Sequence, residues 1–234
     1  MNVNLVSYTP NPDQVCEMAC RTCTSVECPD ISTAVNKTNA LRKALDSGHE
    51  SVAEHAVFTF QIEGISRACS HQLVRHRMAS YSQQSQRYVT KNEHSYVIPH
   101  KITECDKIAW DPIFKRYMND SMVDIFIDLM DMCYDFYDFM IDNGIPMEDA
   151  RYILPNACCT NITVTMNARE LRHFFKLRLC KRAQWEIREL AECMYGCVKH
   201  IAPILFEGVG PACIMDGKCK EKKRCDKDGR TGYA

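Results

Sequence analysis

The sequence has few glycines and no long apolar run. Nine glycines are scattered through 234 residues, and none of them forms a dinucleotide-binding fingerprint or a Walker loop. A bound nucleotide would therefore be held by side chains. No apolar run approaches the roughly 18 residues of a membrane span. Residues 1–10 lack the basic and apolar regions of a secretory signal. We therefore expect a cytoplasmic protein that binds no membrane.

The chain also lacks a strong net charge. Its 29 Lys and Arg residues balance 30 Asp and Glu residues, which leaves a formal charge of −1. Such a chain has no general attraction to nucleic acid, so any site for an anion must be local. We therefore expect small-molecule ligands and no nucleic-acid partner.

Cysteine is abundant, but its pattern does not indicate catalysis. Fifteen cysteines are an odd number, and pairs such as Cys16 with Cys20 have helical spacing, so most are expected to be reduced thiols. Cys69 and Cys180 lie near basic residues without forming a recognisable nucleophile motif. Cys213, Cys219 and Cys225 stand six apart, unlike the close pairs of common zinc sites. A metal with a fourth ligand or a disulfide remains open there, and we predict no metal site.

One basic segment is depleted of acids. No Asp or Glu occurs between Glu63 and Glu93, and residues 75–88 combine three arginines and a histidine with hydroxyl and amide side chains. Guanidinium groups match phosphate oxygens, while Ser and Gln side chains can bind neutral polar groups of the same ligand. The segment therefore indicates a site for an anionic ligand.

Hydrophobic periodicity predicts an α+β fold. Helices are predicted over residues 11–24, 32–47, 65–74, 110–141, 146–154, 168–178 and 183–201. Strands are predicted over residues 57–62, 96–98 and 162–166. Gly64 is expected to end the first strand, and Asn167 to cap the helix after it, with Glu170 at the third position. We expect one domain over residues 1–206 and a polar, cysteine-containing tail over 207–234.

Several motifs together resemble the flavin-dependent thymidylate synthases. The main one is Arg75-His76-Arg77, seven residues, Ser85, one residue, and then Arg87-Tyr88. Further matching segments are Arg21-Thr22-Cys23, Gly48-His49-Glu50-Ser51 with Glu54-His55, Gln72, Arg151 with Leu154-Pro155, Asn167-Ala168-Arg169 through Arg178, and residues 183–188. The resemblance covers about residues 15–206.

This resemblance implies a reaction and an assembly. Such enzymes methylate dUMP to dTMP with methylenetetrahydrofolate as carbon donor and NADPH as reductant through FAD. The implied fold is a single α+β domain of the thymidylate synthase-complementing type, with long helices around a small mixed or antiparallel sheet. The implied assembly is a homotetramer with shared active sites.

The resemblance also implies ligand-binding residues. The implied dUMP set is Gln72, Leu73, Val74, Arg75, Gln83, Gln84, Ser85, Gln86, Arg87, Arg151 and Arg178. The implied FAD set is His49, Ser51, Arg75, His76, Arg77, Gln83, Asn167, Ala168, Arg169 and His173.

Residue chemistry suits these roles. Arg87 and Ser85 suit the 5′-phosphate. Arg178 is the predicted catalytic residue, because a fixed cation at the uracil ring favours its deprotonated, electron-rich form. No cysteine nucleophile is required.

The chain departs from the commoner family residues at three positions. Ser82 and His173 each stand where Asn is frequent, and Gln83 stands where Glu is frequent. The neutral Gln83 relieves repulsion with a phosphate.

Two other functions use the same basic segment. One is a nucleotide- or RNA-binding module without catalysis, whose affinity would fall steeply with salt. The other is a flavoprotein that acts on a different pyrimidine, such as a uracil methylase of RNA.

Overall fold

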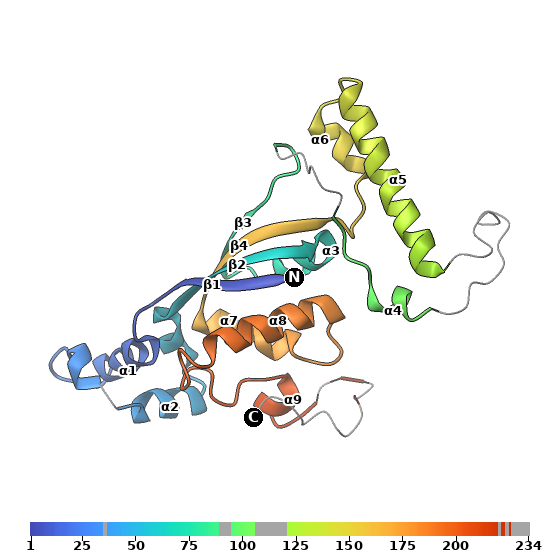
Figure 1. Cartoon of the computed structure of the whole chain (residues 1–234). Coiled ribbons are helices and arrows are strands. Elements are labelled where there is room, and N and C mark those ends of the chain that lie inside the picture. The colour runs from blue at the N-terminus through green and yellow to red at the C-terminus, as the bar shows by residue number, and fades with distance from the viewer. Residues whose placement is uncertain (35–36, 89–94, 106–120, 220, 223–224, 226–234) are drawn as a thin grey trace. The chain divides into compact units, whose positions relative to one another are not determined.

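The computed structural model describes residues 1–34, 37–88, 95–105, 121–219, 221–222 and 225 (Figure 1). Helices flank a small antiparallel sheet with strand order β1-β2-β4-β3. The strands are β1 Asn2–Tyr8, β2 Val57–Ser66, β3 Ala79–Gln83 and β4 Cys159–Asn167. The predicted α+β class is confirmed.

The two central strands were predicted and the two edge strands were not. In β2, Phe58, Phe60 and Ile62 are fully buried and alternate with more exposed residues, as the sequence pattern predicts. The expected end of this strand at Gly64 was wrong. Gly64 takes φ +70° and its amide donates to the Asn161 side chain at 3.1 Å, while the strand itself extends to Ser66. A glycine with positive φ can bend a strand without ending it.

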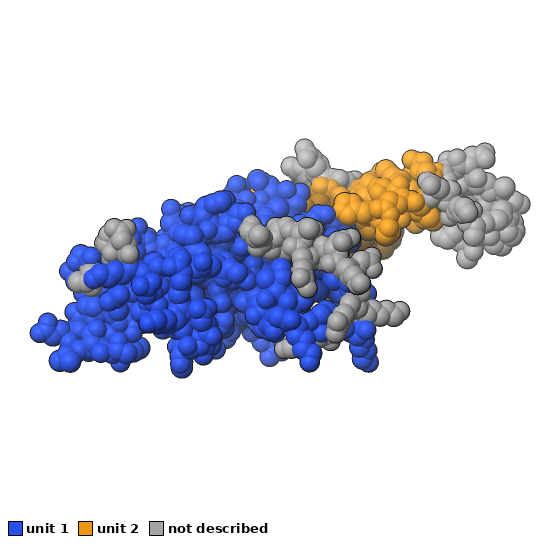
Figure 2. Space-filling model, turned by 90° about the horizontal axis from the view of Figure 1, so that it is seen from below, with its two compact units in different colours: residues 1–62, 71–82, 162–234 blue, residues 63–70, 83–161 orange. Residues whose placement is uncertain are grey.

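The chain divides into two compact units (Figure 2). Unit 1 contains residues 1–62, 71–82 and 162–234, and unit 2 contains residues 63–70 and 83–161. The predicted boundary at residue 206 stays a prediction. Beyond it lies the short helix α9, Ala212–Met215, and Asp216 accepts a hydrogen bond from Lys176 at 2.6 Å.

Unit 1 holds the aromatic core. Its longer helices are α1 Pro12–Thr22, α2 Asn39–Asp46, α7 Ala168–Arg178 and α8 Trp185–Val198. Helices α7 and α8 lie beside each other below the sheet in the view of Figure 1, and α8 packs against β1. The Phe206 ring meets those of Phe58 and Phe175 edge to face, with centroids 5.7 and 5.8 Å apart. The predicted helices 11–24, 168–178 and 183–201 are confirmed, with ends shifted by a few residues.

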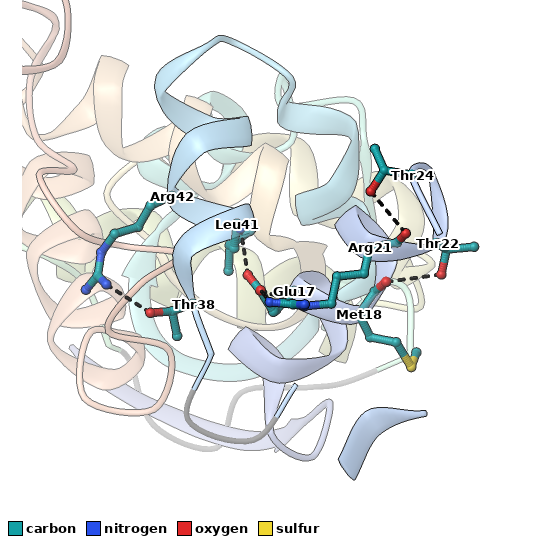
Figure 3. A network of polar contacts seen from close by, with 8 residues as sticks. All are labelled: Glu17, Met18, Arg21, Thr22, Thr24, Thr38, Leu41 and Arg42. Carbon is teal, nitrogen blue, oxygen red and sulfur yellow. Dashed lines mark hydrogen bonds and ion pairs between the residues drawn. The ribbon is translucent and has the colours of Figure 1, made fainter. Parts of the chain in front are cut away.

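The predicted helix 32–47 was wrong over its first part. A short 3-10 helix, Ile31–Ala34, precedes α2, which begins only at Asn39. The start of α2 is fixed by another helix, because Leu41 N donates to Glu17 Oε2 at 2.7 Å (Figure 3). The other Glu17 oxygen accepts two bonds from Arg21, at 2.6 and 2.9 Å. The fully buried carboxylate of Glu17 is thus paired, and it satisfies an amide at the start of α2.

Unit 2 is mainly helical. It contains α4 His100–Thr103, α5 Met122–Asp142, α6 Met147–Ala150 and the 3-10 turn Arg151–Ile153, while α3 Arg67–Leu73 begins in this unit. The predicted helix 146–154 is divided into α6, which follows Pro146, and the 3-10 turn.

The predicted helix 110–141 lies only partly within the described residues. Its first part, residues 110–120, lies outside them. Ser121 is extended and forms a capping box with Asp124, so α5 starts at Met122. Within α5, the Phe136 side chain is 50% exposed in the single chain.

Two short predictions also need correction. Helix α3 starts at Arg67, because β2 extends through Ser66 into the predicted helix 65–74. The predicted strand 96–98 is reduced to one bridge between Tyr96 and Cys158.

Candidate active site

The predicted catalytic residue lies at the end of α7 in unit 1. Arg178 is the last residue of this helix and is partly buried. Its Nε–H donates to Nε2 of His76 at 3.1 Å. The structure therefore brings together two predicted site residues that are 102 positions apart in the sequence.

His76 is held on its other side by Glu170. The distance from His76 Nδ1 to Glu170 Oε1 is 3.1 Å, and both side chains are at most 10% exposed. Arginine has no acceptor, so Nε2 of His76 must carry the lone pair and Nδ1 the proton. A charged His76 would place Nε2–H against the Arg178 donor. The neutral Nδ1–H form, donating to Glu170, is therefore the form that satisfies both contacts.

The electrostatics of the cluster favour the same neutral form. Burial, followed by the positive charge of Arg178 and the nearby His173, lowers the pKa of His76 to about 4. Burial also raises the pKa of Glu170, which the nearby His173 partly opposes. At neutral pH the imidazole is thus a neutral bridge between a carboxyl group and a guanidinium.

Packing fixes the His76 ring and its backbone. The Phe174 ring meets the imidazole edge to face, with centroids 4.9 Å apart and an interplanar angle of 80°. The Tyr81 hydroxyl lies 2.8 Å from the His76 carbonyl oxygen and 2.9 Å from that of Leu73. Burial and, to a lesser extent, Glu170 raise the pKa of Tyr81, so its hydroxyl stays a donor.

Unit 1 also presents an exposed set of polar and basic side chains. Six predicted FAD-binding residues are exposed: His49, Ser51, Arg75, Arg77, Arg169 and His173. The 3-10 helix Glu50–His55 packs against α7, where Arg169 Nη1 lies 2.5 Å from Glu54 Oε1 and Arg172 Nε lies 3.4 Å from Glu50 Oε1. The donor chemistry of this set fits an anionic cofactor with a pyrophosphate.

Three predicted binding residues have structural roles. Leu73 and Ala168 are fully buried. Asn167 Oδ1 accepts from Glu170 N at 2.9 Å, which confirms the predicted N-cap of α7. Any ligand contact by Leu73 and Ala168 would therefore be made through backbone atoms. Gln72 is half-buried, and Val74 is exposed.

In unit 2, two arginines of the predicted dUMP set contact the same residue. Arg87 Nη2 lies 2.9 Å from a carboxylate oxygen of Glu148, and Arg151 Nε donates to the Glu148 carbonyl oxygen at 3.1 Å. The Arg87–Glu148 pair is about half exposed on both sides, so it is weak and open to exchange. Ser85 Oγ accepts from the Arg87 amide at 3.2 Å. In this structure, Arg87 thus binds the Glu148 carboxylate, whereas the residue is predicted to bind the phosphate of dUMP.

The glutamines of the motif have separate partners in unit 2. Gln83 Nε2 lies 2.9 Å from Ser70 Oγ and 3.2 Å from Thr160 Oγ1. Gln84 N donates to Asn161 O at 2.9 Å, which continues the edge-strand pairing. Gln86 Nε2 lies 3.7 Å from Cys158 Sγ. An amide at position 83 can donate to two hydroxyls at once, which a carboxylate cannot.

The cysteines carry free thiols. Burial raises the pKa of Cys16 to about 12 and that of Cys20 to about 11, so both stay protonated and are poor nucleophiles. Within the described residues, no group of three His, Cys, Asp or Glu side chains is placed to hold a metal ion. None of the described helices is both long and apolar enough to cross a membrane.

Sequence reasoning missed three partners of the site: Glu170, Tyr81 and Glu148. Glu170 was expected only as a helix-start residue, yet its spacing to Phe174 and Arg178 was a usable signal. Residues four and eight apart share one side of a helix, so Glu170 and Arg178 could have been paired. Tyr81 and Glu148 had no comparable local signal.

Comparisons with known proteins identify the family of the chain. Residues 4–204 match the family model described as thymidylate synthase complementing protein. A flavin-dependent thymidylate synthase of Geobacter sulfurreducens is 48% identical over 227 residues, which cover 94% of this chain and 91% of the relative. One of Clostridium tetani is 44% identical over 241 residues, with the same coverage of 94% and 91%.

A solved structure has the same fold. A UMP/dUMP methylase, PolB, from Streptomyces cacaoi, crystallised with 5-bromo-dUMP, superposes with a TM-score of 0.71. It is 26% identical in sequence, and the match covers 88% of this chain and 93% of the other. The chain therefore belongs to an enzyme family of methyltransferases, the flavin-dependent thymidylate synthases.

Proposed function

We propose that this protein makes dTMP by reductive methylation of dUMP. Methylenetetrahydrofolate would supply the carbon, and NADPH would supply the reducing equivalents through FAD. Family membership supports the reaction class. The observation that carries the proposal is the arginine at the end of α7, which is partly buried and tied at Nε to a neutral, immobilised imidazole.

Arg178 is the proposed activator of the pyrimidine. A fixed guanidinium at the uracil ring stabilises the negative charge that develops when the ring loses its N3 proton. The resulting electron-rich C5 attacks the one-carbon unit. Because the guanidinium is held before the substrate arrives, little reorganisation is needed during reaction. This role requires no cysteine nucleophile.

Unit 2 supplies the proposed phosphate-binding residues. Arg87 and Arg151 offer charge-assisted donors, and Ser85 adds a hydroxyl. The carboxylate of Glu148 is bound by Arg87 in an exposed pair. A phosphate has more charge and more acceptor oxygens than this carboxylate, so the phosphate of dUMP can replace Glu148 as the partner of Arg87. Gln72, Arg75, Gln83, Gln84 and Gln86, together with the backbone of Leu73 and Val74, complete the proposed dUMP set.

The proposed flavin-binding residues lie mainly in unit 1. His49, Ser51, Arg75, Arg77, Arg169 and His173 present exposed donors, whereas Asn167 and Ala168 mark the start of α7. Gln83 is the one member from unit 2. Bound FAD supplies the hydride-transfer chemistry, and the chain's own residues bind and orient it. We further propose that the chain assembles as a homotetramer that completes these sites.

Release of tritium from [5-³H]dUMP tests the proposed function. The hydrogen at C5 is lost when a carbon is attached there, so release is expected only with FAD, NADPH and methylenetetrahydrofolate all present. Formation of dTMP should match the tritium released. Absence of release from the folded protein supplied with all cofactors would overturn the proposal.

A second candidate is methylation of UMP. The solved neighbour is named a UMP/dUMP methylase, so both nucleotides are credible substrates for this fold. The same assay with [5-³H]UMP separates the two. We expect dUMP to be the better substrate by kcat/KM, and a clear preference for UMP would favour the second candidate.

A further inference from the structure

We propose that Glu170 is a positioning residue that acts through His76 to set the orientation of the Arg178 guanidinium. This inference rests on the proposed function for its catalytic consequence. Its structural part concerns only unit 1. Neither the family motif nor the sequence patterns assigned Glu170 any role beyond the start of α7.

The two hydrogen bonds of the His76 ring depend on each other, because one nitrogen must accept and the other must donate. Arg178 can only donate, so it requires a lone pair on His76 Nε2. That lone pair exists only while the single ring proton resides on Nδ1, and this proton needs a buried acceptor. Glu170 Oε1, at 3.1 Å, supplies the acceptor. Glu170 therefore determines which ring nitrogen faces Arg178.

Loss of the carboxyl acceptor would disturb Arg178. The Nδ1–H group would then be buried without its partner, which is unfavourable. Moving the proton to Nε2 would place a donor against the Arg178 donor. Turning the ring would break both contacts. Each alternative releases the guanidinium stem from its observed position.

A single helix face holds the whole arrangement. Glu170, Phe174 and Arg178 follow one another at intervals of four residues on α7, and all three contact the His76 ring. The first residue of this set is fixed by the Asn167 cap, and the last ends the same helix. The helix thus sets the distance between the Glu170 carboxyl group and the Arg178 guanidinium, and the His76 imidazole lies between them.

An imidazole bridge has an advantage over a direct ion pair. A carboxylate bound directly to Arg178 would offset the positive charge that the pyrimidine requires. The neutral ring instead orients the guanidinium while keeping the carboxyl group one side chain away. Both ring nitrogens of His76 are therefore engaged within the protein. We assign the His76 side chain to holding Arg178 rather than to bonding FAD through its ring nitrogens.

Two substitutions at the same position test the inference. Glu170→Gln keeps an oxygen that accepts from Nδ1–H, whereas Glu170→Leu removes the acceptor and keeps a similar size. We expect Glu170→Gln to retain kcat within about threefold. We expect Glu170→Leu to lose about tenfold to a hundredfold in kcat, as when a catalytic group is displaced by ~1 Å. KM for dUMP should change less than kcat, because the lost interaction is strongest in the transition state.

Glu17→Gln is the matched control. Glu17 is also a buried glutamate on a helix of unit 1, but it holds α2 and Arg21 (Figure 3). This variant should lower the thermal midpoint while leaving kcat unchanged. A fall in kcat at Glu17→Gln equal to that at Glu170→Leu would reduce Glu170 to a general stability role and overturn the inference.

A spectroscopic measurement tests the arrangement without catalysis. In ¹⁵N-histidine spectra of the wild-type protein at pH 7, His76, assigned by its loss in His76→Gln, should show an unprotonated Nε2 and a protonated Nδ1. A protonated Nε2 in the wild type would overturn the inference, even if Glu170→Leu failed to fold. If the wild type shows the expected tautomer but releases no tritium, the proposed function fails and the arrangement stands.

Discussion

Acidification should destabilise this protein through His76, and the size of the effect follows from its surroundings. Arg178, His173 and Glu170 are the titratable or charged groups that interact with the ring. The pKa of His76 is lowered to about 4 in the folded chain, against about 6.5 for an unfolded one. Between these two pH values, His76 binds a proton in the unfolded chain but stays neutral in the folded chain. The contribution of neutral His76 to the free energy of unfolding is therefore fully present above pH 6.5, and it falls as the pH drops towards 4.

The expected loss between pH 7 and pH 5 is about 1 to 2 kcal/mol, after allowance for solvent screening of the shift. His76→Gln is the matched variant. Its side-chain amide can donate to Glu170 and accept from Arg178 but does not titrate in this range. Urea unfolding followed by circular dichroism, at several pH values between 7.5 and 5, gives the free energy of unfolding for each chain.

The wild type should lose about 1 to 2 kcal/mol more than His76→Gln over this interval. Parallel curves would refute the lowered pKa. A gain in wild-type stability on acidification, relative to the variant, would show that His76 and Glu170 form an ion pair with a charged imidazole.

Three other substitutions have defined outcomes. Arg178→Ala should keep the bound flavin spectrum but lose turnover, and retained tritium release would contradict the ring-activating role. Arg87→Ala should weaken dUMP binding about tenfold or more through loss of a charged contact, measured by calorimetry against Arg42→Ala as control; an unchanged Kd would contradict the phosphate assignment. Asn167→Ala should lower the free energy of unfolding by about 1 kcal/mol through loss of the α7 cap, and an unchanged denaturation midpoint would contradict that capping role.

The accuracy of the strand predictions followed position in the sheet. The central strands β2 and β4 alternate clearly because one face of each packs on the core, as the buried Phe58 and Val164 show. Strands β1 and β3 lie at the edges, and every residue of each is at least partly exposed. An edge strand needs fewer apolar residues, so its sequence has a weaker period. No strand was therefore predicted over the polar residues 79–83.

Helix boundaries that depend on residues far away in the sequence could not be predicted from local sequence patterns. The Asn167 cap lies beside its own helix and was predicted correctly. The start of α2 depends on Glu17, which is 24 residues away from Leu41 in the sequence. A local pattern cannot contain such a contact, so the two segments between 31 and 46 were predicted as one helix.

The site shows the same division between local and distant information. The resemblance to the family predicted Arg178 and His76 as site residues because both lie in recognisable segments. Their contact, and the carboxyl group that orients it, arise only when the chain after α3 folds against α7. Residue chemistry then explains the charge state of the ring. Sequence thus predicted a set of candidate groups, while the fold shows which of them contact one another.

The most direct test of the account is an anaerobic single-turnover experiment with the wild-type protein. The protein, loaded with reduced FAD, is mixed with dUMP and methylenetetrahydrofolate, and both dTMP and oxidised flavin are measured. We predict that they form together in equal amounts. Flavin that stays reduced with no dTMP formed, or a folded protein that takes up no FAD at all, would contradict the central claim.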